Sequence, residues 1–259
     1  MSRTIVWYSD GAASAVAAKM AIDRADGPVQ VVKCDTTEDE HSDNIRFRED
    51  VERWIGQEVI LIKSDKYANV DDVFMTTRYM AGPSGARCTT ELKKLVRRQY
   101  QEPDDIHVFG YTLDEEKRIQ RFEANNPELT CWWVLRDEQI SKEDCYFILD
   151  QAGIALPEMY RLGYDHNNCL GCVKASSASY WARIRRDFPD AFSKRAEQSR
   201  ELGARLVRWQ GERIFLDELP EEASPKGSDG NIECGPFCEM EPSLFSQNAF
   251  LEDADAEGD

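Results

Sequence analysis

The first twenty-two residues of the chain constrain its fold more than any other stretch. Residues 4–8 are mostly β-branched and aromatic, residues 9–14 are small or polar, and an Ala-rich run with Val16 and Met20 one turn apart continues to Ile22. This order predicts a buried strand, a short loop and a helix, the first β-α unit of an open parallel sheet. Small residues let a ligand approach the loop, and the helix N-terminus offers amides and the positive end of its dipole. The stretch therefore predicts a phosphate site, with an ordinary loop that binds nothing as the alternative.

Strand and helix patterns alternate from here to Gly153. Further strands are predicted at residues 29–35, 59–62, 106–110 and 131–135, and helices at residues 43–55, 71–80, 86–98, 114–124 and 141–152. We therefore expect residues 1–163 to form a nucleotide-binding α/β domain with a doubly wound, mainly parallel sheet of about five strands. Ligands bind such sheets at the carboxyl ends of the strands, where the sequence has Ser9, Asp35 and Gly110.

The next segment, residues 164–219, has a different character. It begins with a loop that contains Cys169-x-x-Cys172 and continues with two basic helices, predicted at residues 176–186 and 189–202. Two short apolar runs around Gln210-Gly211 then predict a β-hairpin. We expect this segment to be a helical, Cys-rich appendage to the sheet domain.

Residues 220–259 form an acidic segment with a Cys pair, Cys234 and Cys238. The net charge of −17 is concentrated near this end, because thirteen acidic residues and only one lysine follow Leu216. Charged residues with Pro, Gly and Ser and few apolar groups cannot build a core. The composition therefore predicts a mobile tail from about Glu221, which would carry one of its cysteines to the nucleotide site.

Composition also restricts the class of protein. The chain has no run of about 18 apolar residues and passes from Met1 almost directly into a strand, so we expect no membrane span, no signal peptide and a cytoplasmic location. The acidic balance argues against a general nucleic-acid binder. Eight cysteines would stay reduced in the cytoplasm, so clustered ones suggest metal or redox chemistry.

The cysteines fall into two groups. The Cys169-x-x-Cys172 pair, together with Cys88, Cys234 and Cys238, supplies enough thiolates for a four-ligand site and one spare. Thiolates favour zinc or an iron-sulfur cluster over hard cations. The third alternative is that these cysteines are thiols that bind no metal. The remaining three lie in strand or helix patterns and are expected to be small core residues: Cys34, Cys131 and Cys145.

Five motifs occur in order along residues 4–215. They are the loop from Ser9 to Ser14, Cys34-Asp35-Thr36 with Glu40-His41, Arg87-Cys88-Thr89 with Leu92-Lys93, Gly110-Tyr111-Thr112 with Glu116 and Arg118, and Cys169-x-x-Cys172. In this order they resemble the phosphoadenosine phosphosulfate (sulfonucleotide) reductase family, including members carried by phages and mobile elements, within the adenine-nucleotide α-hydrolase (PP-loop) superfamily. The loop departs from the superfamily pattern Ser-Gly-Gly-x-Asp-Ser at Asp10 and Ala13. ATP-cleaving members have an acid where this chain has Ala13, and sulfonucleotide reductases also lack it.

The resemblance implies an adenine nucleotide across the strand ends, with its phosphates on the loop and its ribose or base near Asp35. Lys93 and Arg118 would hold the sulfate or terminal phosphate, because both side chains donate charge-assisted bonds. It also implies a four-iron four-sulfur cluster on Cys88, Cys169 and Cys172 with Cys238 or Cys234 as fourth ligand, and zinc as the alternative. The expected nucleotide-binding residues are Ser9, Asp10, Gly11, Ala12, Ser14, Asp35, Lys93, Gly110 and Arg118.

Glu233-Cys234-Gly235 resembles the Glu-Cys-Gly-x-His segment that carries the family's nucleophile, although Phe237 stands in the place of its histidine. The resemblance implies that Cys234 attacks the sulfur of an adenylyl sulfate and that a reducing thiol protein then releases the product. The expected function is a sulfonucleotide-reductase-like oxidoreductase. The alternatives are an iron-sulfur-dependent sulfurtransferase that modifies nucleic acid, against which Ala13 argues, and a catalytically silent nucleotide-binding module that docks through its acidic tail.

Overall fold

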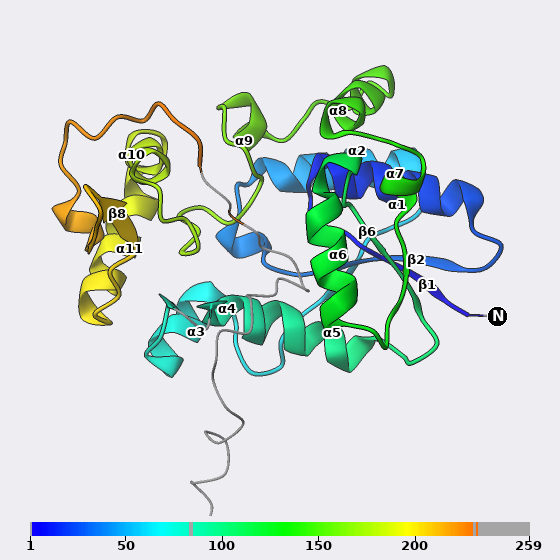
Figure 1. The fold of residues 1–259 in the computed structure, drawn as a ribbon, viewed down its shortest axis with the longest axis horizontal. Helices are drawn as coiled ribbons and strands as arrows, with labels where there is room; N and C mark the ends of the chain where they lie inside the picture. The colour runs from blue at the N-terminus through cyan, green and yellow to red at the C-terminus, as the bar shows by residue number, and fades with distance from the viewer. Residues whose placement is uncertain (1, 83–84, 230–231, 233–259) are drawn as a thin grey trace, which may run out of the picture.

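The computed structural model describes residues 2–82, 85–229 and 232, and its centre is one five-stranded parallel sheet (Figure 1). The strand order is β3-β2-β1-β6-β7, and every neighbouring pair is parallel. The order reverses between β1 and β6, so the chain has a Rossmann-like α/β fold. This confirms the expected fold class. The bounds are β1 Thr4–Trp7, β2 Val29–Cys34, β3 Ile60–Ile62, β6 Ile106–Phe109 and β7 Thr130–Trp132.

Helices cover both faces of the sheet because successive strand residues point to opposite sides. Val6 of β1 belongs to a core formed with α1, α2, α7 and α8, whereas Ile5 and Trp7 belong to a core formed with α5 and α6. The bounds are α1 Ala12–Arg24, α2 Asp43–Ile55, α5 Leu95–Tyr100, α6 Glu116–Asn125, α7 Val134–Asp137 and α8 Lys142–Gln151.

A third core lies beside the sheet, on the left in Figure 1, and is centred on the fully buried Trp181. It joins helices of the C-terminal segment to α3 and the short β4–β5 pair, and it includes Cys169 and Cys172. The predicted hairpin is confirmed as β8–β9, with Gln210 and Gly211 at positive φ in the turn. The bounds are α3 Val70–Thr77, β4 Ala81–Gly82, β5 Gly85–Ala86, α4 Arg87–Thr89, α9 Glu158–Arg161, α10 Ala178–Asp187, α11 Pro189–Glu201, β8 Val207–Trp209 and β9 Glu212–Ile214.

The predicted strand at residues 131–135 is wrong in its second half. β7 ends at Trp132, and α7 begins at Val134, with the Asp137 amide donating to the Trp133 carbonyl at 2.9 Å. Val134 and Leu135 are both buried. A short apolar run fits a buried helix as well as a buried strand, so its hydrophobicity could not separate the two.

The helix predicted at residues 86–98 contains a π turn, η2, at Thr90–Lys94 between α4 and α5. A π turn takes up one extra residue, so the side chains after it are rotated by roughly 100° from the α-helical register. Cys88 and Leu92 face the core as expected, but Leu95 is 39% exposed, whereas Arg97 is only 5% exposed. An uninterrupted α-helix over residues 86–98 would instead place Leu95 on the inward face with Cys88 and Leu92, and Arg97 on the solvated face, so the sequence pattern alone is wrong for these two side chains.

The prediction of a mobile tail from about Glu221 is wrong for residues 221–229, because these residues are bonded to the rest of the structure. Arg183 donates to the carbonyl of Gly227 at 2.7 Å, and the buried carboxylate of Asp229 accepts from the Asp165 amide at 2.7 Å. Ala223 and Ile232 are buried in the third core. Cys234 and Cys238 lie outside the described residues. None of the described helices is long and apolar enough to cross a membrane.

Gly110, directly after β6, lies against the first turn of α1. A Cβ at this position would lie 2.5 Å from the Ser14 nitrogen and 2.8 Å from the Ala13 carbonyl carbon, both backbone atoms that cannot move alone. We therefore expect Gly110→Ala to lower the free energy of unfolding by about 1–3 kcal/mol, the usual cost of overpacking, measured by urea denaturation. Gly27→Ala is the matched control, because its Cβ would have an ordinary 3.4 Å contact. Equal effects of the two changes would contradict the argument.

Candidate functional site

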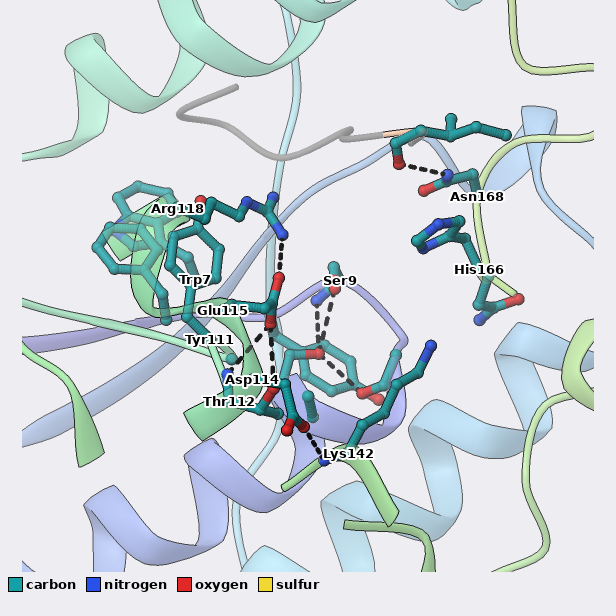
Figure 2. Close-up of a pocket in the computed structure, with 18 of the residues that line it drawn as sticks. Trp7, Ser9, Tyr111, Thr112, Asp114, Glu115, Arg118, Lys142, His166 and Asn168 are labelled. Carbon is teal, nitrogen blue, oxygen red and sulfur yellow. Dashed lines mark hydrogen bonds and ion pairs between the residues drawn. The ribbon is translucent and has the colours of Figure 1, made fainter. Parts of the chain in front are cut away.

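A cavity of about 1030 Å³ opens where the strand order reverses (Figure 2). The carboxyl ends of β1, β2 and β6 form its floor, and segments after β6 and α9 form its walls. Six of the nine expected nucleotide-binding residues line this cavity: Ser9, Gly11, Ser14, Lys93, Gly110 and Arg118.

The loop between β1 and α1 presents hydroxyls and amides to this cavity. Ser14 Oγ donates to the Gly11 carbonyl at 2.9 Å and lies 3.2 Å from both the amide and the hydroxyl of Ser9. Gly11 is the N-cap of α1 and forms no side-chain cap. The Ala12 amide is bonded to the Tyr160 hydroxyl. The remaining amides at the N-terminus of this thirteen-residue helix, together with the serine hydroxyls, suit an anion. Ala12, the first residue of α1, is buried and can contribute only its backbone.

Asp10 lies beneath the loop instead of in the cavity. Its φ is +54°, its side chain is fully buried, and its carboxylate pairs with the buried ammonium of Lys33. Lys33 Nζ also donates to Glu40 Oε2 at 2.7 Å. Burial raises the pKa of Asp10, an effect that the charge of Lys33 opposes. Burial acts in the same direction on Glu40, but the charges of Lys33 and Lys93 and the hydrogen bonds from Lys33 and Thr36 together outweigh it and hold the pKa of Glu40 below its usual range.

Asn167 links this ion-pair cluster to the cysteine segment. Its side-chain amide donates to the Asp10 carbonyl oxygen at 2.6 Å and to Asn44 Oδ1 at 2.9 Å. Three residues later, the Leu170 amide donates to the Asp39 carbonyl at 2.8 Å. The anion loop and the Cys169–Cys172 loop are therefore bonded to the same part of the sheet domain.

Aromatic rings line one side of the cavity. Trp7, Phe109 and Tyr111 reach its surface, and the Tyr111 ring stacks on Trp133 with centroids 5.6 Å apart and planes 11° apart. Arg118 lies 4.1 Å from the Tyr111 centroid and also pairs with Glu115. A flat apolar surface edged by a guanidinium suits a planar base.

The wall opposite the aromatic rings carries Lys142 and His166 (Figure 2). Burial lowers the pKa of His166, and the positive charge of Lys142 lowers it further. The lowered pKa favours the neutral imidazole, which can accept a hydrogen bond but takes up a proton less readily than a free histidine. Asp35, also expected at the nucleotide, instead lines a separate small cavity, where Lys63 Nζ lies 3.1 Å from its Oδ2.

Three of the expected metal ligands surround one small cavity of about 20 Å³, namely Cys88, Cys169 and Cys172. Gly171 has a φ of +65° and lies against the Trp181 ring, which allows the tight loop between the last two. Among residues 2–82, 85–229 and 232, no three or more His, Cys, Asp or Glu side chains are arranged to hold a metal ion. The donor set still fits a thiophilic centre, since three sulfurs and no described carboxylate line the cavity.

The other three described cysteines behave as the expected core residues. Cys34 and Cys145 are buried, and Cys131 packs against the same core as Cys34. Burial raises the pKa of each of these thiols to about 12, so they are poor ligands and poor nucleophiles.

Sequence reasoning missed Lys33, Asn167, His166 and Arg195. Only Lys33 left a signal, because a charged residue interrupts an otherwise apolar strand end. The others depend on contacts between segments far apart in the chain.

Neither a scan of protein-family models nor a search of curated proteins finds a match to this chain.

Removing Lys33 should destabilise the protein strongly. Lys33→Met leaves Asp10 and Glu40 buried without their countercharge, a loss that typically costs about 3–5 kcal/mol. Urea denaturation measures it, with Lys63→Met as control, because the Lys63 side chain is 66% exposed and its pair with Asp35 should contribute at most about 1 kcal/mol. Asp10→Asn in the Lys33→Met background should restore part of the loss. Similar effects of the two lysine changes would show that the buried pair is not stabilising the loop.

Asp39 should make stability depend on pH. Burial raises the pKa of Asp39 to about 6, and the negative charge of Asp71 acts in the same direction. The positive charges of Arg195 and Lys194 oppose this shift. The folded state therefore binds this proton more tightly than the unfolded state, and the stabilisation is full below about pH 4 and is lost as the pH rises through 6. The difference in unfolding free energy between wild type and Asp39→Asn should fall over this range and level off above it. A difference independent of pH would contradict the assignment.

Proposed function

We propose that this chain is a sulfonucleotide-reductase-like enzyme, which binds an adenine nucleotide carrying a sulfate or phosphate in the large cavity and acts on its sulfur with a thiol. One observation carries the proposal: Lys93 and Thr36 line both the large cavity and the cysteine cavity. An anion held by Lys93 would therefore lie beside the three sulfurs. An ordinary nucleotide-binding domain has no need of that juxtaposition.

The large cavity supplies what a nucleotide of this kind requires. The α1 N-terminus with Ser9 and Ser14 would take a phosphate, and the rings of Phe109 and Tyr111 would take the base. Lys93 and Arg118 would hold the remaining anionic group through charge-assisted bonds. Ala13, at the start of α1, carries no side chain that could serve ATP cleavage, which favours a reaction at sulfur.

The three cysteines at the small cavity would hold a four-iron four-sulfur cluster, with zinc as the alternative and with Cys234 or Cys238 as fourth ligand. Such a cluster would supply a redox-active charge beside the sulfate. Lys93, between the two cavities, would orient the anion and screen it from the negative thiolates.

The nucleophile in this proposal is Cys234. Ile232 lines the large cavity, is buried, and accepts a hydrogen bond from Asn168 Nδ2 at 3.3 Å through its carbonyl. Cys234 follows two residues later in the sequence, and two residues span at most about 7 Å. Its nearness along the chain to a cavity-lining residue supports Cys234 as the nucleophile.

The reaction would consume two thiols. The Cys234 thiolate attacks the sulfuryl sulfur, a sulfur-sulfur bond forms, and the nucleotide leaves with the electron pair of the broken sulfur-oxygen bond. A second thiolate, from a reducing protein, then attacks Cys234 and releases sulfite, so the two thiols are oxidised to a disulfide.

Calorimetry with adenosine 3′,5′-bisphosphate, AMP and ATP tests the nucleotide site. Lys93→Ala should weaken bisphosphate binding by about 10–100-fold, the value of a charge-assisted hydrogen bond. Arg98→Ala, in the same helical segment but exposed, should leave it unchanged. No heat from any of the three ligands would refute the proposal.

Sulfite release from adenylyl sulfate in the presence of a dithiol tests the reaction. Cys234→Ser should abolish release and leave nucleotide binding intact, whereas Cys145→Ser, in the core, should keep activity. A wild-type protein that binds nucleotide but releases no sulfite would instead be the silent binding module.

A further inference from the structure

Arg195 is a buried cation in the wall of the cysteine cavity. It projects from α11, and its side chain is only 6% exposed. Its Nη1 donates to Asp71 Oδ1 at 2.9 Å and to Gln198 Oε1 at 2.7 Å, and its guanidinium lies 5.1 Å from the Phe74 ring centroid. These contacts fix a group that would otherwise have great conformational freedom.

The Nε of this guanidinium is buried and has no hydrogen-bond partner among the described residues. A buried donor without an acceptor typically costs about 1–3 kcal/mol, so the position calls for an acceptor. The described residues around the cavity offer the three sulfurs and the Thr36 hydroxyl, whereas their other side chains are apolar or cationic. Thiolate and inorganic sulfide both accept hydrogen bonds from N–H groups.

We infer that Arg195 donates its Nε–H to a sulfur of the centre held by Cys88, Cys169 and Cys172 and thereby raises the reduction potential of that centre. The inference rests on the proposed cofactor. A positive charge and a hydrogen bond at sulfur both stabilise the more negative, reduced state. Arg195 acts here as a tuning residue and does not contact the nucleotide.

The chain offers a matched control in Lys194. This neighbouring side chain pairs with the same carboxylate, Asp71, but is 60% exposed and does not line the cavity. A change at Lys194 therefore alters the charge around Asp71 and leaves the cavity wall intact. The comparison therefore separates the loss of positive charge near Asp71 from the loss of a cation in the cavity wall.

The test is a redox titration of the anaerobically purified full chain, followed by the visible absorbance and electron paramagnetic resonance of the cluster. Arg195→Gln should lower the ratio of reduced to oxidised cluster at fixed potential about tenfold, which is 59 mV for a one-electron couple. Lys194→Gln should change it less than twofold. Arg195→Lys, which keeps the charge and loses the Nε–H, should fall between wild type and Arg195→Gln. An intact cluster with an unchanged midpoint in Arg195→Gln would overturn the inference.

The metal content of the purified protein separates a failure of this inference from a failure of the proposed cofactor. Zinc in place of iron would refute the iron-sulfur cluster, and the contact would then be tested in the zinc protein. There Arg195→Gln should speed metal transfer to a chelator at least fivefold, and Lys194→Gln should not. Equal release rates would overturn the role of Arg195 whichever metal is bound. If Arg195→Gln retains no metal, Arg195→Lys provides the same comparison with a smaller expected shift.

Discussion

The loop between β1 and α1 depends on an almost fully buried ion pair beneath it. Lys33 at the end of β2 meets Asp10 under the loop and Glu40 beyond it, and both contacts lie in the interior. An unpaired charge at this depth would be very costly, so the three side chains must be in place together. Asp10 is held at positive φ, a conformation that few residues other than glycine adopt. The pair therefore holds this aspartate in a backbone shape that glycine adopts more readily.

The same cluster connects the parts of the molecule that could do chemistry. Through Asn167 it reaches the loop of Cys169 and Cys172, and through Thr36, whose hydroxyl donates to Glu40 Oε1 at 2.6 Å, it reaches the wall between the two cavities. The large cavity and the cysteine cavity are thus supported by one set of buried polar contacts. A change in either cavity would act on groups that the other also needs.

The local sequence pattern was sufficient to predict most of the sheet and helices. The signals that end a strand or a helix, such as Gly56 after α2 and the Ser141 cap of α8, depend only on residues adjacent in the sequence. The pattern failed at Val134, because a short run of buried residues shows neither the helical nor the strand periodicity of hydrophobic residues. It also failed at Leu95, because the π turn before it changes the helical register. For the site, the loop and the three cysteines could be predicted from motifs. Lys33 and Arg195 could not, since a buried cation is recognised only from the carboxylates and sulfurs that surround it in space.

The bond from Asn167 to residue 10 ends on a backbone carbonyl, and this has a consequence for how the sequence can vary. Any residue able to adopt the turn would satisfy Asn167, so the carboxylate at residue 10 is required by its cationic partners, Lys33 and, at 3.6 Å, Arg48. Losing the lysine alone leaves Glu40 and Asp10 short of positive charge, and losing Asp10 alone leaves Lys33 with Glu40 as its remaining anionic partner. A neutral residue at position 10 therefore needs a compensating change at Lys33, so these two positions are expected to vary together.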